Sequence, residues 1–333
     1  MKYIKGLIGF LLILSLLLFI RNTDFSKVAA SVQKIGFNFM VVFSTTIAAY
    51  FFGTIGWRYC LGQDGAKIGV WRLFIIRHVG ETVGVINPTS IVGGDALKVF
   101  MLKTEGIEQK AVLTSVLVSR LVMVISQLFL FLMALVLVFA TSGRDALPAP
   151  VSVSTPAYAP PFLIVGVIAI GVALCFAWWR LRYGRSSATT VRTITQGLQN
   201  VKRALAEARA FCVVNKRSVA LSFLFFSVHW IFGSLEFYFI LRFLGFQSSV
   251  IEGLFIDMGV VFFKAAGAFI PGQVGIEEYG NKVMLAITGI VAAEIWITAS
   301  LLRRARQAIW LLVGLGAYAL IRQRSPVNRV NSQ

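Results

Sequence analysis

The sequence predicts an all-α polytopic membrane protein, with six full transmembrane helices and two re-entrant helical hairpins arranged as an inverted repeat. Of the 333 residues, 57% are hydrophobic and only 14% are charged, which is more apolar than a soluble domain needs to fill one core. Apolar stretches of roughly 20 residues, the length that crosses a bilayer, recur along the chain. The formal charge of +18 lies mostly between these stretches, where basic residues act as topology signals.

Six stretches have the length and composition of full membrane spans. They are Tyr3–Ile20, Phe39–Trp57, Val112–Thr141, Phe162–Trp179, Val219–Phe243 and Ala292–Ile321. Lys2 and Lys5 precede the first of them, and Val28-Ala29-Ala30 resembles a signal-peptidase site. We interpret this first stretch as an uncleaved anchor, because the internal repeat described below requires it.

Two further apolar segments, Leu73–Val92 and Leu254–Ile276, contain charged residues, glycine and proline. The interrupting residues include Arg77, Glu81, Asn87 and Pro88 in the first segment, and Asp257, Lys264, Pro271 and Gly272 in the second. The charges that flank each segment make it enter and leave on one side, which predicts re-entrant hairpins. Irregular backbone at membrane depth needs protein or water to satisfy its hydrogen bonds, so the hairpin tips predict a hydrated, protein-lined cavity.

The connecting segments predict the topology. Residues 180–217 contain nine basic residues against Glu207 alone, which places this loop in the cytoplasm. The periodic apolar residues within the loop predict a basic amphipathic helix. The chain is thereby divided into a first half (1–141), an external linker (142–161) and a second half (162–333) whose cytoplasmic loop covers 180–218. We expect a multi-pass protein of a bacterial-type inner membrane with both termini in the cytoplasm, although Arg21, Lys27 and Lys34 then fall outside.

An internal repeat relates the two halves. When Pro88 is aligned with Pro271, other residues match without a gap: Gly84 with Gly267, Gly106-Ile107 with Gly289-Ile290, Ser115 with Thr298, and Arg120 with Arg303. An odd number of crossings separates the two copies, so they have opposite orientations in the membrane. This is the plan of many secondary transporters, whose substrate sites lie where the repeats meet.

Four arginines lie inside long apolar stretches: Arg120, Arg303, Arg304 and Arg306. Each central arginine costs about 2.5–3.5 kcal/mol on insertion scales, so we expect these side chains to line the cavity. Guanidinium groups offer forked donors that match phosphate oxygens, which favours the phosphate of a lipid head group as the ligand. The alternative is that the arginines form structural ion pairs, with Glu81, Glu236, Asp257 or Glu294 as partners.

The candidate site residues fall into three groups. The head-group group consists of Arg120, Arg303, Arg304, Arg306, Asn87, Thr89, Ser90 and Lys98. The hairpin or gating group consists of Pro88, Gly93, Gly94, Pro271, Gly272 and Gly275. The charge-pairing or coupling group consists of Arg77, Glu81, Asp95, Glu236, Asp257, Lys264, Glu277 and Glu278.

Some of these residues have more specific expected roles. Glu81 and Lys264 are equivalent in the repeat and opposite in charge, so they are expected to pair with each other or to gate the cavity in turn. Asp95 follows Gly93-Gly94, and Glu277-Glu278 follows Gly275, where the return helices should begin. Helix capping is therefore their expected role, with proton coupling or recognition of a cationic head group as alternatives.

Several classes of protein are disfavoured. Cys60, Cys175 and Cys212 lack paired spacing and His78 and His229 stand far apart, so we expect no disulfide framework, metal or cofactor. Phosphate-binding glycine loops and hydrolase motifs are missing from the sequence, and the basic residues do not form a soluble nucleic-acid-binding face. The expected partners are membrane lipids, with a lipid- or glycan-modifying enzyme and a second copy of the chain as further candidates.

Three segments resemble one known family. They are Gly84-Val-Ile-Asn87-Pro88, Gly93-Gly94-Asp95-Ala96-Leu97-Lys98 and Ile270-Pro271-Gly272-Gln-Val-Gly275-Ile-Glu277. With Arg120 between them, they resemble the flippase-like transmembrane family, the membrane region of lysylphosphatidylglycerol synthases. The resemblance implies a lipid translocase. We expect no synthase activity, because the chain leaves no room for the soluble aminoacyl-transferring domain.

The sequence therefore favours a flippase, not an enzyme, that moves an anionic phospholipid, glycolipid or polyprenyl-linked lipid across the bacterial inner membrane by alternating access. One alternative is an ion-coupled permease for a small anion. Another is a non-transporting membrane partner of a lipid- or glycan-modifying enzyme. The last is a membrane-embedded lipid-modifying enzyme that uses Glu81, Asp95 or Glu277 as an acid or base.

Overall fold

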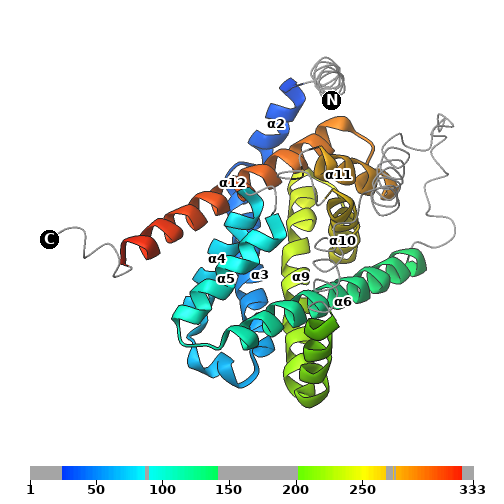
Figure 1. The fold of residues 1–333 in the computed structure, drawn as a ribbon. Helices are drawn as coiled ribbons and strands as arrows, with labels where there is room; N and C mark the ends of the chain where they lie inside the picture. The colour runs from blue at the N-terminus through cyan, green and yellow to red at the C-terminus, as the bar shows by residue number, and fades with distance from the viewer. Residues whose placement is uncertain (1–24, 87–89, 142–201, 268–272, 274, 325–333) are drawn as a thin grey trace, which may run out of the picture.

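The computed structural model describes residues 25–86, 90–141, 202–267, 273 and 275–324, and within these residues the fold is helical with no strand (Figure 1). The expected spans Tyr3–Ile20 and Phe162–Trp179 and the linker 142–161 lie outside the described residues. The first half contains α2 (Phe25–Ile35), α3 (Phe39–Cys60), α4 (Val70–Ile86), α5 (Ser90–Thr104) and α6 (Gln109–Thr141), with the short helices η1 (Gly36–Asn38) and η2 (Gly62–Lys67). The second half contains a helix over 202–214, then α9 (Lys216–Leu244), α10 (Val250–Ala266), α11 (Ile276–Ile287) and α12 (Ala293–Arg324).

Three helical stretches are long and apolar enough to cross a membrane, judged by length and composition: Ser26–Cys60, Gln109–Val138 and Lys216–Leu244. They contain most of the spans expected in α3, α6 and α9. The fourth expected span within the described residues, Ala292–Ile321, forms the continuous helix α12, which does not meet the same criterion. Its arginines at positions 303, 304 and 306 lie in the middle of the helix and lower its hydropathy.

The antiparallel pair α3 and α9 forms the centre of the molecule (Figure 1). Near one end of the pair, Ser222 Oγ donates to the Gly56 carbonyl at 2.9 Å. Further along, His229 Nδ1 lies 2.7 Å from the Ala49 carbonyl. From the first contact to the second, the residue number rises along α9 and falls along α3. The two helices therefore run antiparallel. Small residues such as Gly56 allow the close approach, because a side chain there would press against Phe226.

Helical hairpins form at both predicted places, with different boundaries. The first consists of α4 and α5, and its return helix already begins at Ser90. Gly93 and Gly94 therefore lie inside α5, which corrects the prediction that the return helix begins after them. Gly94 is needed for helix packing, because a Cβ there would collide with the Gly80 carbonyl oxygen on α4. The second hairpin consists of α10 and α11.

The two halves repeat the same elements at an offset of 183 residues. The helices α3, α4, α5 and α6 correspond in order to α9, α10, α11 and α12. The turn before the last helix of each half is the same: Gly106 and Gly289 have φ of 82° and 85°. Their N–H groups donate to Lys103 O and Ala286 O at 3.1 and 3.0 Å, and the next residue bonds in each case to the carbonyl five positions earlier. These are the two bonds of a Schellman motif, which satisfies the last carbonyls of a helix.

Polar side chains stabilise several helix ends. Ser249 and Glu252 form a capping box at the start of α10, with bonds of 3.1 and 2.8 Å. Lys34, at the end of α2, donates from Nζ to the Leu244 carbonyl at 2.6 Å. The last turn of α9 therefore carries a cation at the negative end of its dipole. The contact explains why a basic residue occupies a segment that the charge distribution alone assigned to the outside.

Candidate functional site

A cluster of buried charges lies where α9, α10, α11 and α12 meet. Its centre is Arg303 on α12, whose side chain is only 4% exposed. Arg303 Nη1 lies 2.8 Å from Asp257 Oδ1 on α10, and Nε lies 3.1 Å from Glu277 Oε1 on α11. Glu236 of α9 is 3.7 Å from Arg303 and also accepts from Arg306 Nε at 2.7 Å. One guanidinium thus joins three carboxylates from three different helices.

The outer part of this cluster adds further contacts to Glu277 and Glu278. Lys264 Nζ lies 3.5 Å from Glu277, and Gln307 Nε2 donates to both oxygens of the same carboxylate at 3.1 and 2.9 Å. Arg304 Nε donates to Glu278 at 2.7 Å. The cluster therefore balances four basic residues (Lys264, Arg303, Arg304, Arg306) against four acidic ones (Glu236, Asp257, Glu277, Glu278). Such neutrality is what buried charges require in a medium of low dielectric constant.

The first half contains a smaller group of charges with a different balance. Arg77 Nε donates to Glu81 Oε1 at 2.7 Å, one turn apart on α4. Asp95 on α5 lies 3.2 Å from Lys98 Nζ and 3.1 Å from Arg120 Nη2 on α6. Three basic side chains thus face two carboxylates, which leaves an excess of one positive charge.

The repeat explains why the two groups differ. The three carboxylates that bind Arg303 are Glu236, Asp257 and Glu277; 183 residues earlier the chain has Gly53, Phe74 and Gly94. Arg120, the equivalent of Arg303, therefore lacks the counterparts of all three partners. It pairs with Asp95 instead.

Arg120 also differs from Arg303 in its exposure. The Arg120 side chain is 47% exposed, against 4% for Arg303. Its neighbours Leu121 and Val124 on α6 are 42% and 52% exposed. A half-exposed guanidinium among exposed aliphatic side chains of a long apolar helix is placed to meet a ligand that is polar at one end and apolar at the other.

The geometry corrects two expectations: the pairing of Glu81 with Lys264 and the capping of a helix by Asp95. Glu81 and Lys264 do not pair with each other, because each has a partner within its own half: Arg77 and Glu277 respectively. Asp95 does not cap a helix, because α5 begins at Ser90 and places Asp95 in its second turn. Glu278 does act at a helix start, where it accepts from the Gly275 backbone N–H at 2.7 Å. Gly275 itself has a φ of 84°, which glycine adopts without strain.

The remaining candidates divide into buried and undescribed residues. Lys98 is buried, and its Nζ lies 5.7 Å from the centre of the Trp57 ring. Asn87, Pro88, Thr89, Pro271 and Gly272 lie outside the described residues, so the cavity expected between the hairpin tips stays a prediction. Ser90 is the first residue of α5.

Sequence reasoning missed Gln307 and Trp57. Gln307 lies one turn after Arg303 on the same face of α12, and this i, i+4 spacing could have identified it as a second ligand of Glu277. Trp57 donates from Nε1 to Ser115 Oγ at 3.3 Å and supports α6 five residues before Arg120. An aromatic residue in an apolar helix carries no signal that would distinguish this role.

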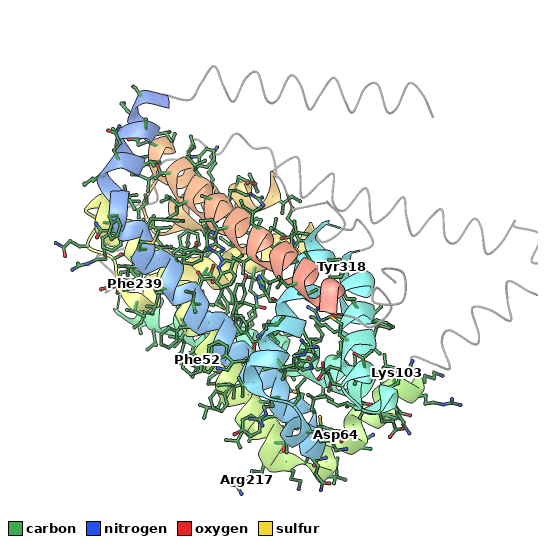
Figure 2. The ribbon with its side chains drawn as sticks, turned by 90° about the vertical axis from the view of Figure 1, so that its left-hand side faces the viewer. Phe52, Asp64, Lys103, Arg217, Phe239 and Tyr318 are labelled. Atoms are coloured by element: carbon green, nitrogen blue, oxygen red, sulfur yellow. The ribbon has the colours of Figure 1, made fainter. Side chains whose placement is uncertain are left out.

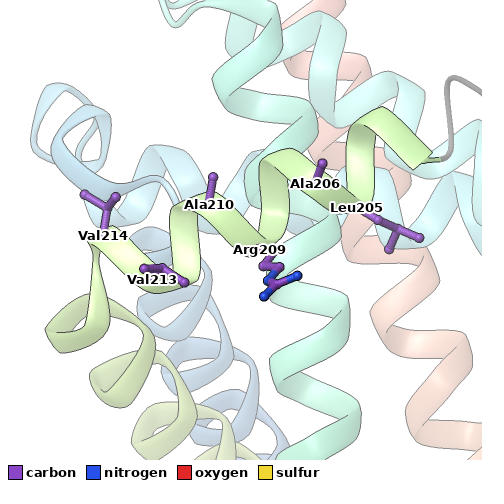
Figure 3. Close-up of a pocket in the computed structure, with 6 residues that line it drawn as sticks. All are labelled: Leu205, Ala206, Arg209, Ala210, Val213 and Val214. Carbon is purple, nitrogen blue, oxygen red and sulfur yellow. The ribbon is translucent and has the colours of Figure 1, made fainter.

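A hollow of about 610 Å³ lies elsewhere, on the helix over 202–214 (Figure 3). The described residues that line it all belong to this one helix: Leu205, Ala206, Arg209, Ala210, Val213 and Val214. It is a surface groove, because Leu205, Val213 and Val214 are 47%, 60% and 79% exposed. Ala208 of the same helix is buried. The rest of the basic loop, residues 180–201, lies outside the described residues.

Long apolar helices that bury charge clusters in their packed interior define an all-helical integral membrane protein. The chain belongs to the family described as the lysylphosphatidylglycerol synthase TM region, whose model matches residues 6–316. The family resemblance of its hairpin motifs is thereby confirmed, and it connects the protein with lipid biosynthesis or translocation in a membrane. No match was found among the curated proteins or among the solved structures.

Proposed function

We propose that the protein is a flippase that moves an anionic lipid across the bacterial inner membrane, and that Arg120 is the first residue to contact the head group. The observation that carries the proposal is the difference between the equivalent arginines. Arg303 is enclosed by three carboxylates, whereas Arg120 is half exposed and lies in a group with an excess positive charge. An anionic head group would complete the charge balance of this group.

The position of Arg120 on α6 favours a lipid over a small soluble anion. A permease for a soluble anion would enclose its substrate. The exposed neighbours Leu121 and Val124 instead suit acyl chains that stay in the bilayer while the head group reaches the guanidinium. Among lipids, an anionic phospholipid, glycolipid or polyprenyl-linked lipid meets this requirement.

Alternating access is the mechanism that an inverted repeat would support. The equivalent helices α3 and α9 pack antiparallel, as copies of opposite orientation should. In our proposal α4–α5 and α10–α11 are the two re-entrant hairpins, and the full protein has six spans. The halves are unequal, with the arginine of the first half exposed and that of the second half enclosed. Transport would alternate the side of the membrane from which the site at Arg120 is accessible, while the cluster around Arg303 stays intact.

The charge distribution supports an orientation in the membrane. Figure 2 shows Asp64, Lys103 and Arg217 toward one end of the molecule and Phe239 farther from it. The first three of these residues belong to the segments 58–72, 103–110 and 202–217, whose basic residues are Arg58, Lys67, Arg72, Lys103, Lys110, Lys202, Arg203, Arg209, Lys216 and Arg217 and whose acidic residues are Asp64, Glu105, Glu108 and Glu207. By the positive-inside rule this end would face the cytoplasm, with both termini on the same side.

Transport fits the carboxylates better than covalent catalysis does. Glu81, Asp95 and Glu277, the candidate acids or bases, each contact at least one cation within 3.5 Å. Each of these carboxylates is therefore already occupied by a cation of the protein, as expected for charge pairs in the interior of a membrane protein. We propose on this ground that the protein is not an enzyme. Its partners would be membrane lipids, together with a lipid- or glycan-modifying enzyme that supplies or uses the transported lipid.

Reconstitution of the full chain tests the proposal. Vesicles would contain an acyl-labelled phosphatidylglycerol, and a membrane-impermeant quencher would report how fast the labelled lipid changes leaflet. Arg120→Ala should slow the exchange about tenfold, because a charge-assisted contact to phosphate is lost. The control is Arg242→Ala, which removes an exposed arginine bonded to Gln247. Unchanged exchange in Arg120→Ala would remove the proposed site, and uptake of a soluble anion with no lipid exchange would favour the permease.

A further inference from the structure

The carboxylate of Asp95 lies between an inner and an outer cation. Its Oδ1 is 3.2 Å from Lys98 Nζ, and its Oδ1 and Oδ2 are 3.1 and 3.3 Å from Arg120 Nη2. The side chains are 8% exposed for Lys98, 19% for Asp95 and 47% for Arg120. Exposure therefore increases along the three charges, from the enclosed lysine to the accessible arginine.

The contact between Asp95 and Arg120 leaves donors of the guanidinium available. Both carboxylate oxygens meet the single nitrogen Nη2, while an arginine has five N–H donors. The geometry is not the parallel two-nitrogen pairing that makes arginine–carboxylate contacts strongest. A phosphate that approaches from the exposed side would make that stronger contact.

We infer that Asp95 is a displaceable counter-ion, which neutralises Arg120 when no lipid is bound and is replaced there by the phosphate group of the substrate. The inference rests on the proposed function and adds the event that sets affinity and release. On binding, phosphate oxygens accept N–H bonds from Arg120 and the bonds from Arg120 to Asp95 break. On release, Asp95 returns to Arg120.

Lys98 makes this exchange feasible inside a membrane. A buried carboxylate that lost its only partner would be strongly destabilised. Asp95 keeps Lys98 after it leaves Arg120, and Lys98 is held in place beside the Trp57 ring. The second half has no such arrangement at its central arginine, because Arg303 is bound by carboxylates from three helices. The displaceable pair therefore exists at Arg120.

The test compares lipid affinity in matched variants of the full chain. Purified protein in a neutral detergent would be titrated with phosphatidylglycerol, with phosphatidylcholine as a zwitterionic reference, and bound lipid counted by native mass spectrometry. Asp95→Asn should bind phosphatidylglycerol roughly fivefold more tightly, because the competing anion is gone. Arg120→Ala should bind phosphatidylglycerol more weakly. Asp95→Asn combined with Arg120→Ala should bind it as weakly as Arg120→Ala alone.

Two further variants separate displacement from other effects. Glu105→Gln removes a carboxylate that lies 2.6 Å from Arg72 outside the site, so it changes the net charge by the same amount as Asp95→Asn. It should bind lipid like the wild type. Asp95→Asn combined with Lys98→Met restores the local charge and guards against poor folding of a protein with an unpaired lysine; it should retain tighter binding.

Soluble glycerol phosphate distinguishes the two sources of the phosphate. A gain in affinity of Asp95→Asn for both ligands supports displacement by the phosphate group itself, and a gain for the lipid alone supports displacement by a head group held in the bilayer. An unchanged or weaker affinity of Asp95→Asn for both, or an equal gain in Glu105→Gln, would overturn the inference. If either of these results were found while Arg120→Ala still weakened lipid binding, the counter-ion role of Asp95 would be rejected and the head-group site at Arg120 would stand. If Arg120→Ala bound lipid like the wild type, the head-group site itself would be rejected.

Discussion

Arg120 and Arg303 occupy equivalent positions 183 residues apart, and each pairs with an acidic residue of the short helix that precedes its own. Arg120 contacts Asp95 at 3.1 Å, and Arg303 contacts Glu277 at 3.1 Å. The surroundings of the two pairs differ, because Arg303 has two more carboxylate partners and is almost fully enclosed. The arginine at this position is thus part of the packed interior in the second half, whereas in the first half it remains accessible.

Removal of Arg303 should destabilise the protein far more than removal of Arg120. Arg303→Ala leaves three carboxylates without their shared cation in a buried environment, and breaking such an arrangement costs about 3–5 kcal/mol. Arg120→Ala removes a half-exposed pair, for which about 1 kcal/mol is expected. Unfolding in sodium dodecyl sulfate would measure both. Equal losses of stability would contradict the assignment of Arg303 as a structural centre.

Gly94→Ala should disrupt the first hairpin. The new Cβ would collide with the Gly80 carbonyl oxygen, and overpacking of this kind costs about 1–3 kcal/mol. Gly316→Ala on α12 is the matched control, because among the described residues no atom outside the surrounding turns of its own helix lies within 4 Å of its Cβ position. That variant should be as stable as the wild type or slightly more so, since alanine favours a helix over glycine. Thermal unfolding in detergent would show whether the two variants separate.

Gly106→Ala and Gly289→Ala should destabilise the protein by similar amounts. Both glycines have φ above 80° and end their helices with the same pair of bonds. An alanine in this left-handed conformation costs about 1–2 kcal/mol. The unfolding midpoints of the two variants would be compared. A clear effect in one and none in the other would argue against equivalent turns.

Cysteines placed in the two equivalent connections should be labelled from opposite sides of the membrane. Lys67→Cys lies between α3 and α4, and Gln247→Cys lies between α9 and α10; both side chains are exposed. An inverted repeat requires a membrane-impermeant maleimide to reach one site in intact cells and the other only after permeabilisation. Labelling of both sites from the same side would contradict the inverted arrangement.

The apolar lengths determined the long helices, and the positions of the helix pairs α4–α5 and α10–α11 were predictable but not their boundaries. α3, α6 and α9 contain most of the predicted spans because a run of about 20 apolar residues is itself the property that makes a span. The return helix α5 already begins at Ser90, although Gly93-Gly94 suggested a later start. Glycine also permits close helix packing, and sequence alone does not distinguish the two uses.

The sequence by itself determined the class of the protein, the family motifs and the register of the repeat, because hydropathy and fixed spacing are properties of the chain. Only the tertiary structure decided which charges meet. Glu81 and Lys264 are opposite in charge and equivalent in position, yet each pairs within its own half. Asp95 proved to be the partner of Arg120, 25 residues away on another helix. Ion pairing depends on distances of a few ångströms between side chains of different helices, and these distances are set by how the helices pack.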